Sequence, residues 1–181
     1  MEKFQPDRMF NERKFLMLGS SIPVIMYHHM LPMGGGLAVT PEIFADHLAA
    51  LQSNGWKTLS GKEFLYLLQS GNFPYKTILL TFDASFADNY FYADPILKRY
   101  DMKALLFVAT SFIENRDIKR GDFVPLQQDE AWKLAYSERR SEVMCTWNEL
   151  REMEENGVFD IQSHGHSHNI PYFINIGFQL T

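Results

Sequence analysis

The feature that most constrains the fold is a steady alternation of short apolar runs with amphipathic stretches. Five runs have the length of strands: residues 22–27, 56–59, 78–82, 104–109 and 158–162. The run at 78–82 (ILLTF) is apolar almost throughout, as strands covered on both faces are. Strands that alternate with helices favour an α/β fold with a parallel sheet, and we predict a barrel or part of one.

Local signals predict where the helices between these runs begin. Three starts carry such signals: Thr40-Pro41, Ser60 with Glu63, and Thr146 with Glu149. The first is an N-cap followed by a first-turn proline, and the other two have capping-box spacing. Residues 88–100 predict a helix that Pro95 kinks or divides. Residues 114–142 are charged and aperiodic, so we expect a surface insertion there with a helix near residues 130–136.

Length and charge exclude several classes of protein. A chain of 181 residues suits one domain with a single core. Its formal charge of −5, with scattered Lys and Arg, gives no basic face for nucleic acid. No stretch approaches the 18 or so apolar residues of a membrane span, and the polar N-terminus does not resemble a signal peptide. Cys145 is the only cysteine, and we expect it to be a small buried hydrophobe.

An aspartate lies where an α/β fold places its chemistry. Asp83 comes just after the strand predicted at 78–82. In parallel α/β folds the carboxyl ends of the strands and the loops that follow them carry the active site. Asp83 taken alone could equally cap the turn that follows.

A second polar cluster follows the last predicted strand. Residues 163–168 read SHGHSH, so His164, His166 and His168 make up half of the six histidines in the chain. Neutral imidazole is the most common zinc ligand, and two or three histidines in one short loop can share an ion. A solvated loop that merely contains histidines is the alternative, and the position after a buried strand favours the metal site.

These segments resemble the polysaccharide deacetylase family of metal-dependent carbohydrate esterases. Residues 78–90 (ILLTFDASFADNY) are similar to its first motif, a strand followed by Thr-Phe-Asp-Asp, and residues 160–168 (DIQSHGHSH) to its second. Residues 23–30, 95–108 and 146–157 also resemble the branch that deacetylates poly-N-acetylglucosamine. The resemblance covers most of residues 22–168, with the motifs in the expected order.

The resemblance implies a distorted (β/α) barrel that binds one divalent metal, usually zinc, and removes the N-acetyl group of an aminosugar. Asp83 matches the catalytic base of the family, and His164 and His168 match its two histidine ligands. The third ligand of the family follows the base, and here that position is Ala84. Alanine offers no donor, whereas catalytic zinc sites generally use three protein ligands and water. His166 could substitute as a ligand, or Asp83 could change from base to ligand.

Other departures concern the end of the domain. The later motifs of the family, an Arg-x-Pro-Tyr segment and a late histidine that serves as general acid, are absent from this chain. We therefore expect residues 1–20 to be an N-terminal extension and residues 21–181 to be the N-terminal part of a C-terminally incomplete domain. An apolar sheet edge near residues 158–162 should then remain uncovered.

Two adjacent histidines at the end of the first predicted strand would lie at the same rim. His28 and His29 occupy a position where the similar branch has a Tyr-His pair. Their side chains could line the pocket or substitute as ligands, or they could be structural histidines. The sequence leaves these readings open.

The function that the resemblance implies is metal-dependent N-deacetylation of a polysaccharide that contains N-acetylglucosamine. A catalytically inactive carbohydrate-binding domain is the main alternative, favoured by Ala84, and a truncated fragment is another. Members of the family often act in the cell envelope or outside the cell. The sequence leaves the oligomeric state open.

Overall fold

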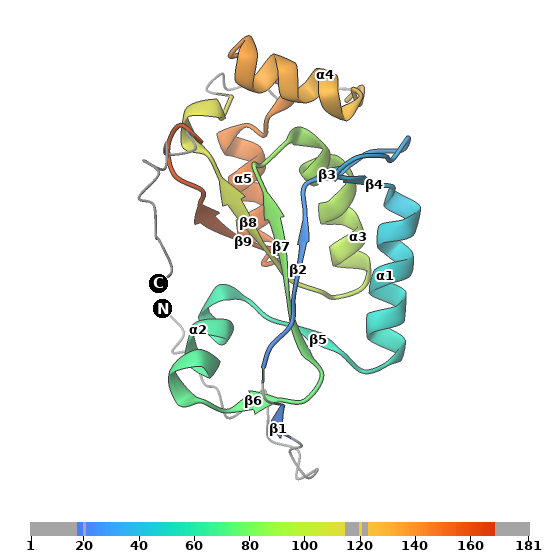
Figure 1. Cartoon of the computed structure of the whole chain (residues 1–181), viewed down its shortest axis with the longest axis vertical. Coiled ribbons are helices and arrows are strands. Elements are labelled where there is room, and N and C mark those ends of the chain that lie inside the picture. Colours follow the sequence, from blue (N-terminus) through green and yellow to red (C-terminus); the bar gives the residue numbers. More distant parts are fainter. Residues whose placement is uncertain (1–17, 20, 115–119, 121–122, 169–181) are drawn as a thin grey trace, which may run out of the picture.

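A computed structural model describes residues 18–19, 21–114, 120 and 123–168. Within them the chain forms a mainly parallel sheet flanked by helices (Figure 1). No helix in this described part is long and apolar enough to cross a membrane.

The central sheet has five parallel strands. They are β2 (Val24–Tyr27), β5 (Lys57–Thr58), β7 (Thr77–Asp83), β8 (Ala104–Val108) and β9 (Phe159–Ser163). The order is β2-β7-β8-β9, and β5 pairs with the beginning of β7 on the side that faces β8. Each strand coincides with one of the five predicted runs, so the prediction of a parallel α/β sheet is confirmed.

Four shorter strands escaped the sequence analysis because each has only two residues. β1 (Leu18–Gly19) pairs antiparallel with β6 (Phe73–Pro74). β3 (His29–Met30) pairs parallel with β4 (Ala38–Val39) beyond the end of β2. No alternation of apolar and polar residues can be recognised in so short a segment.

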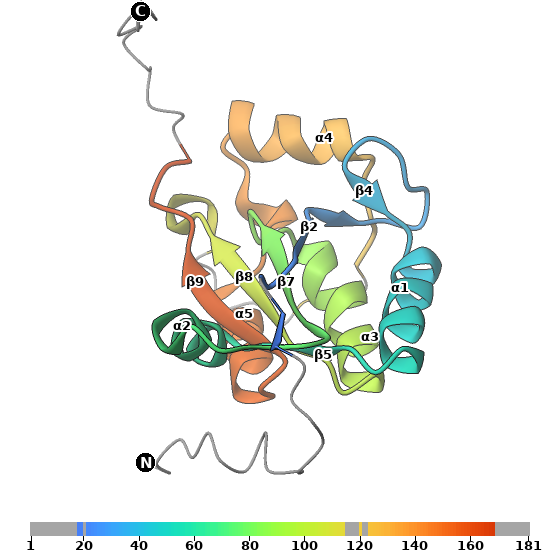
Figure 2. The same ribbon diagram turned by 60° about the horizontal axis from the view of Figure 1, so that its bottom comes forward.

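The two faces of the sheet are covered differently (Figures 1 and 2). The helices are α1 (Pro41–Ser53), α2 (Gly61–Ser70), α3 (Asp94–Arg99), α4 (Gln128–Trp132) and α5 (Trp147–Glu155). Side chains of α1, α3 and α5 pack with Leu80, Phe82 and Leu106 on one face, where they form the main core. On the opposite face, α2 packs through Leu67 against Leu79 and Leu105 near the beginnings of the strands.

The predicted helix starts agree with the structure. Thr40 accepts a hydrogen bond from the backbone of Ile43, and complete capping boxes open α2 and α5. The segment 88–100 consists of two short helical elements that meet just before Pro95, as one of the two expectations had it. A π-helical turn, η2 (Asn89–Ala93), leads directly into α3, and Pro95 lies in the first turn of α3, where its missing N–H costs little.

The described strands form an open sheet and do not show the barrel that was expected. The apolar run 22–27 is typical of a buried strand, but the structure leaves most of it exposed. Val24, Ile25 and Met26 are 53%, 37% and 58% exposed, because β2 lies at the edge of the sheet and only Tyr27 reaches the core. β9 forms the opposite edge of the described sheet, and its exposed residues, Gln162 and Ser163, are polar.

Candidate active site

The carboxyl ends of the strands meet at one rim of the sheet, below α4 (Figure 1). Asp83 is the last residue of β7 and pairs with Phe107 of β8, and Phe107 pairs with Gln162 of β9. His164 follows β9 directly, and its backbone N–H donates to the carbonyl of Val108 (2.8 Å). Parallel pairing therefore places Asp83 and His164 on the same rim, two strands apart.

The backbone turns sharply after Asp83. Ala84 and Ser85 have φ angles of 76° and 56°, in the left-handed region that residues other than glycine adopt rarely. The N–H of Ala84 donates to the carbonyl of Phe107, and the N–H of Cys145 donates to the carbonyl of Ser85, both at 3.0 Å. Such strained backbone persists where the surrounding structure holds it, and it is concentrated at functional sites.

The histidine loop is bonded to the loop that follows β8. Thr110 donates its N–H to the carbonyl of Gly165 (3.2 Å), and Ser111 donates to the carbonyl of His166 (2.9 Å). The His166 ring is exposed, and its Nδ1 lies 2.9 Å from the hydroxyl of Thr110. The rings of His164 and His168 instead lie close together, with centroids 4.7 Å apart and ring planes tilted by 49°. The structure thus separates His166 from the other two histidines of the loop.

Electrostatic coupling connects the polar groups of the rim. Partial burial lowers the pKa of His168, and the nearby His164 lowers it further, whereas the charge of Asp83 acts in the opposite direction. Burial also lowers the pKa of His28, which is coupled to both Asp83 and His164. Four of the residues singled out from the sequence, Asp83, His28, His164 and His168, therefore lie within range of one another's charges.

The adjacent histidines His28 and His29 lie in different environments. His28 is half-buried and follows Tyr27, which pairs with Phe82, so His28 lies beside Asp83. His29 is fully buried, with its ring centroid 3.9 Å from that of Phe86. Its Nδ1 lies 2.7 Å from a carboxylate oxygen of Asp88. His29 is thus part of the interior, and His28 faces the rim.

Aromatic side chains from α4 and the π-helical turn η4 (Lys133–Ser137) form a wall beside the histidine loop. Trp132 stacks on Tyr136 at a centroid distance of 4.5 Å, and Tyr136 lies 5.1 Å from the ring of His168. Burial, together with the charge of Asp83, raises the pKa of Tyr136 to about 12, so its hydroxyl keeps its proton at neutral pH. The segment predicted as a surface insertion therefore contributes to the candidate site.

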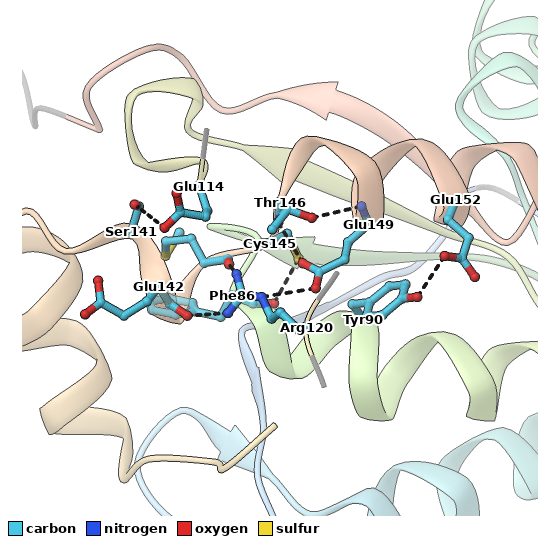
Figure 3. A network of polar contacts seen from close by, with 11 residues as sticks. Phe86, Tyr90, Glu114, Arg120, Ser141, Glu142, Cys145, Thr146, Glu149 and Glu152 are labelled. Carbon is cyan, nitrogen blue, oxygen red and sulfur yellow. Dashed lines mark hydrogen bonds and ion pairs between the residues drawn. The ribbon is translucent and has the colours of Figure 1, made fainter. Parts of the chain in front are cut away.

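A network of polar contacts holds together the segments that surround the candidate site (Figure 3). Arg120 donates to the carbonyls of Glu142 and Met144 and pairs with the carboxylate of Glu149 at 3.1 Å. The Cys145 thiol donates to the carbonyl of Phe86 (3.3 Å), and this bond links the network to the strained turn. The network connects the inserted segment to the turn after Asp83 and to the start of α5.

The donors at the rim suit zinc in kind but not in number. Imidazole and carboxylate groups are among the donors that zinc prefers, and the rings of His164 and His168 lie close together at the rim. The side chain of Ala84 supplies none and is only 1% exposed. Across the residues described, no three His, Cys, Asp or Glu side chains are placed to hold one metal ion. We therefore assign no step of a reaction to a metal.

A cavity of about 420 Å³ lies beside the segment that contributes the aromatic wall, bordered by Ala131 and Leu134 of that segment. It is bordered by Asp88, Arg120, Leu126 and Val143 among others, and its lining includes none of Asp83, His164 or His168. Neither Trp132 nor Tyr136 lines the cavity, so it is separate from the candidate site.

Several residues of the site gave no signal in the sequence. Trp132 and Tyr136 lie in an aperiodic segment, and Arg120 lies in the same charged stretch. Asp88 belongs to the matched segment 78–90 but is separated by four residues from Asp83, so nothing local marks it as a partner of His29. These contacts join segments far apart in the chain, which periodicity cannot detect.

Comparison with known proteins identifies the family. Residues 70–175, more than half of the chain, match the family model described as polysaccharide deacetylase. The chain belongs to the polysaccharide deacetylase family. This agrees with the resemblance found in the segments around Asp83 and His164.

Individual relatives cover parts of the chain. YxkH of Bacillus subtilis, described as a putative polysaccharide deacetylase, is 39% identical over 90 residues, which are 49% of this chain and 32% of that protein. A poly-beta-1,6-N-acetyl-D-glucosamine N-deacetylase of Staphylococcus aureus is 28% identical over 134 residues, 74% of this chain and 39% of that protein. This polysaccharide deacetylase chain thus spans about a third of the length of these curated relatives.

Solved structures show the same fold. The deacetylase PplD of Streptococcus pyogenes, in complex with acetate, superposes with a TM-score of 0.62 at 29% identity, over 82% of this chain and 57% of that one. IcaB from Ammonifex degensii has a TM-score of 0.61 at 23% identity, over 81% and 54% of the two chains, and supports the fold alone.

Proposed function

We propose that the protein to which this chain belongs removes N-acetyl groups from a polysaccharide that contains N-acetylglucosamine. Such an enzyme is a hydrolase acting on carbon–nitrogen bonds other than peptide bonds. The observation that carries the proposal is the gathering of Asp83, His28, His164 and His168 at one rim of a deacetylase-family sheet. The names of the relatives support poly-N-acetylglucosamine as the class of substrate.

Asp83 is the proposed general base. It is half-buried at the end of β7, and its charge acts on His28, His168 and Tyr136. A carboxylate in this position can accept the proton of a water molecule as the water attacks the acetamide carbonyl. The imidazoles of His164 and His168 are the proposed metal ligands, with zinc as the proposed metal. The third donor position is the one that Ala84 leaves empty.

Acetate release tests the assignment of the base. We expect Asp83→Asn to lower the rate of acetate release from β-1,6-linked N-acetylglucosamine oligomers by about 10²–10⁴-fold, the usual contribution of a general base. Asp46→Asn, on the exposed side of α1, is the control and should leave the rate unchanged. Equal rates for Asp83→Asn and the parent chain would remove Asp83 from the chemistry.

A second candidate function is carbohydrate binding without turnover. Ala84 favours it, because the residue is buried, carries no donor and occupies the position of a family ligand. The same oligomers distinguish the two functions: calorimetric binding with no acetate release, with or without added zinc, would identify a binding domain.

A further inference from the structure

The buried side chains His29, Asp88 and Asn89, here called the Asp88 cluster, have no part in the proposed chemistry. Asp88 is 3% exposed, and His29 and Asn89 are fully buried. Asp88 and Asn89 lie at the start of η2, just beyond the strained turn that follows Asp83. Burying a carboxylate is costly unless several donors satisfy it.

The side chains of Asp88 and Asn89 bind the three consecutive residues that follow β2. One carboxylate oxygen of Asp88 lies 2.7 Å from Nδ1 of His29, and the other accepts the backbone N–H of Met30 at 3.0 Å. The amide of Asn89 donates to the backbone carbonyl of His28 at 2.9 Å and to Asp88 at 2.8 Å. Every residue from 28 to 30 is therefore held by a side chain from the segment after Asp83.

These bonds decide which of two identical neighbours faces the site. Successive side chains in extended backbone point to opposite sides, so only one of His28 and His29 can face the rim. A slip of one residue would exchange them at little cost in side-chain chemistry, because both are histidines. The bond from His29 to Asp88, together with the bond from Met30, opposes that slip and leaves His28 beside Asp83.

We propose that Asp88 is a positioning residue that selects His28, and not His29, as the histidine presented to the candidate active site. The geometry of the three bonds carries the inference. The consequence for catalysis rests on the proposed function, whereas the selection between the two histidines does not. Burial raises the pKa of Asp88, and the bonds from His29 and Met30 act against that increase.

Carbethoxylation of the metal-free chain by diethyl pyrocarbonate measures the selection directly. Tandem mass spectrometry can assign the modification to position 28 or 29. In the parent chain we expect His28 to react and His29 to be protected, since it is fully buried. In Asp88→Ala the ratio of modified His29 to modified His28 should rise about tenfold or more, because buried groups that lose their partners are strongly destabilised.

A matched control separates positioning from a general loss of stability. Asp94 is another aspartate that is 3% exposed, and it pairs with Lys98 on α3, away from residues 28–30. Asp94→Ala should lower the melting temperature without changing the ratio of the two modifications. The proposal is wrong if Asp88→Ala raises the modification of His28 and of His29 by the same factor. It is also wrong if Asp88→Ala raises neither modification.

A conservative variant covers the case in which Asp88→Ala does not fold. Asp88→Asn keeps an oxygen for the N–H of Met30 but weakens the bond to His29, so the ratio should shift in the same direction by a smaller factor. An unchanged ratio in a folded Asp88→Asn would also contradict the proposal. Because the readout needs neither metal nor turnover, a parent chain without deacetylase activity would overturn the proposed function and leave this test intact.

Discussion

Replacing Ala84 by aspartate is the most informative change that the structure suggests. Ala84 lies at the position of the third metal ligand in the family, has a φ of 76° and packs in an apolar cluster with Phe86 and Phe112. Aspartate and asparagine tolerate this left-handed backbone better than alanine does. The backbone therefore favours the change, whereas the apolar surroundings oppose a buried charge.

The Ala84→Asp substitution should destabilise the metal-free protein and stabilise the zinc-bound one. Without metal, a carboxylate buried beside these aromatic rings should lower the free energy of unfolding by about 1–3 kcal/mol. With zinc, an anionic third donor should raise the affinity by about 10–100-fold or more, since even changes around the ligands shift it by that factor. A 100-fold gain corresponds to about 2.8 kcal/mol, so saturating zinc should reverse most of the loss.

Two measurements on three chains check this reasoning. Zinc affinity is measured by calorimetry and melting temperature with and without zinc, for the parent chain, Ala84→Asp and Ala84→Asn. The asparagine variant has nearly the same shape and backbone preference but no negative charge, so it should gain little affinity. Equal zinc affinities for all three chains would show that position 84 does not converge with His164 and His168, and the metal-site hypothesis would fail.

Three further predictions use the same chain. Trp132→Ala should weaken oligosaccharide binding several-fold, measured by fluorescence or calorimetry, because the Trp132 ring supports the aromatic wall beside His168. The control variant Trp147→Phe on α5 should leave the affinity unchanged. Equal affinities for the two variants would show that the aromatic wall takes no part in binding. His168 should remain neutral, and so able to bind a metal, at a lower pH than an ordinary imidazole, because burial lowers its pKa; an NMR titration in which His168 takes up its proton above pH 7 would contradict this. The Cys145 thiol should resist thiol reagents in the folded chain, since burial raises its pKa well above the usual value; rapid labelling of native protein would refute this.

The position of the candidate site could be predicted from the sequence because its signals are local. The run 78–82 followed by Asp83, and the run 158–162 followed by Ser163 and His164, mark two strands that end in polar groups. Parallel pairing then brings the two ends to one rim without any knowledge of packing. The capping boxes of α2 and α5 were equally predictable, since each depends on residues three positions apart.

Other features depended on contacts that no local pattern contains. The exposure of β2 follows from its position at the sheet edge, although its apolar run is typical of a buried strand. The aromatic wall arises because the segment 128–137 folds back over the strand ends and brings Tyr136 against His168.

The pair of histidines at positions 28 and 29 shows most clearly what the sequence determines and what only the tertiary structure decides. The sequence by itself determined that two imidazoles follow the first strand at the rim of the sheet, since that depends only on their order in the chain. Which of the two faces Asp83 was decided only in the tertiary structure, by a hydrogen bond between His29 and Asp88, 59 residues away. Neighbouring side chains on extended backbone point to opposite sides, and when the neighbours are chemically identical only a distant partner can distinguish them.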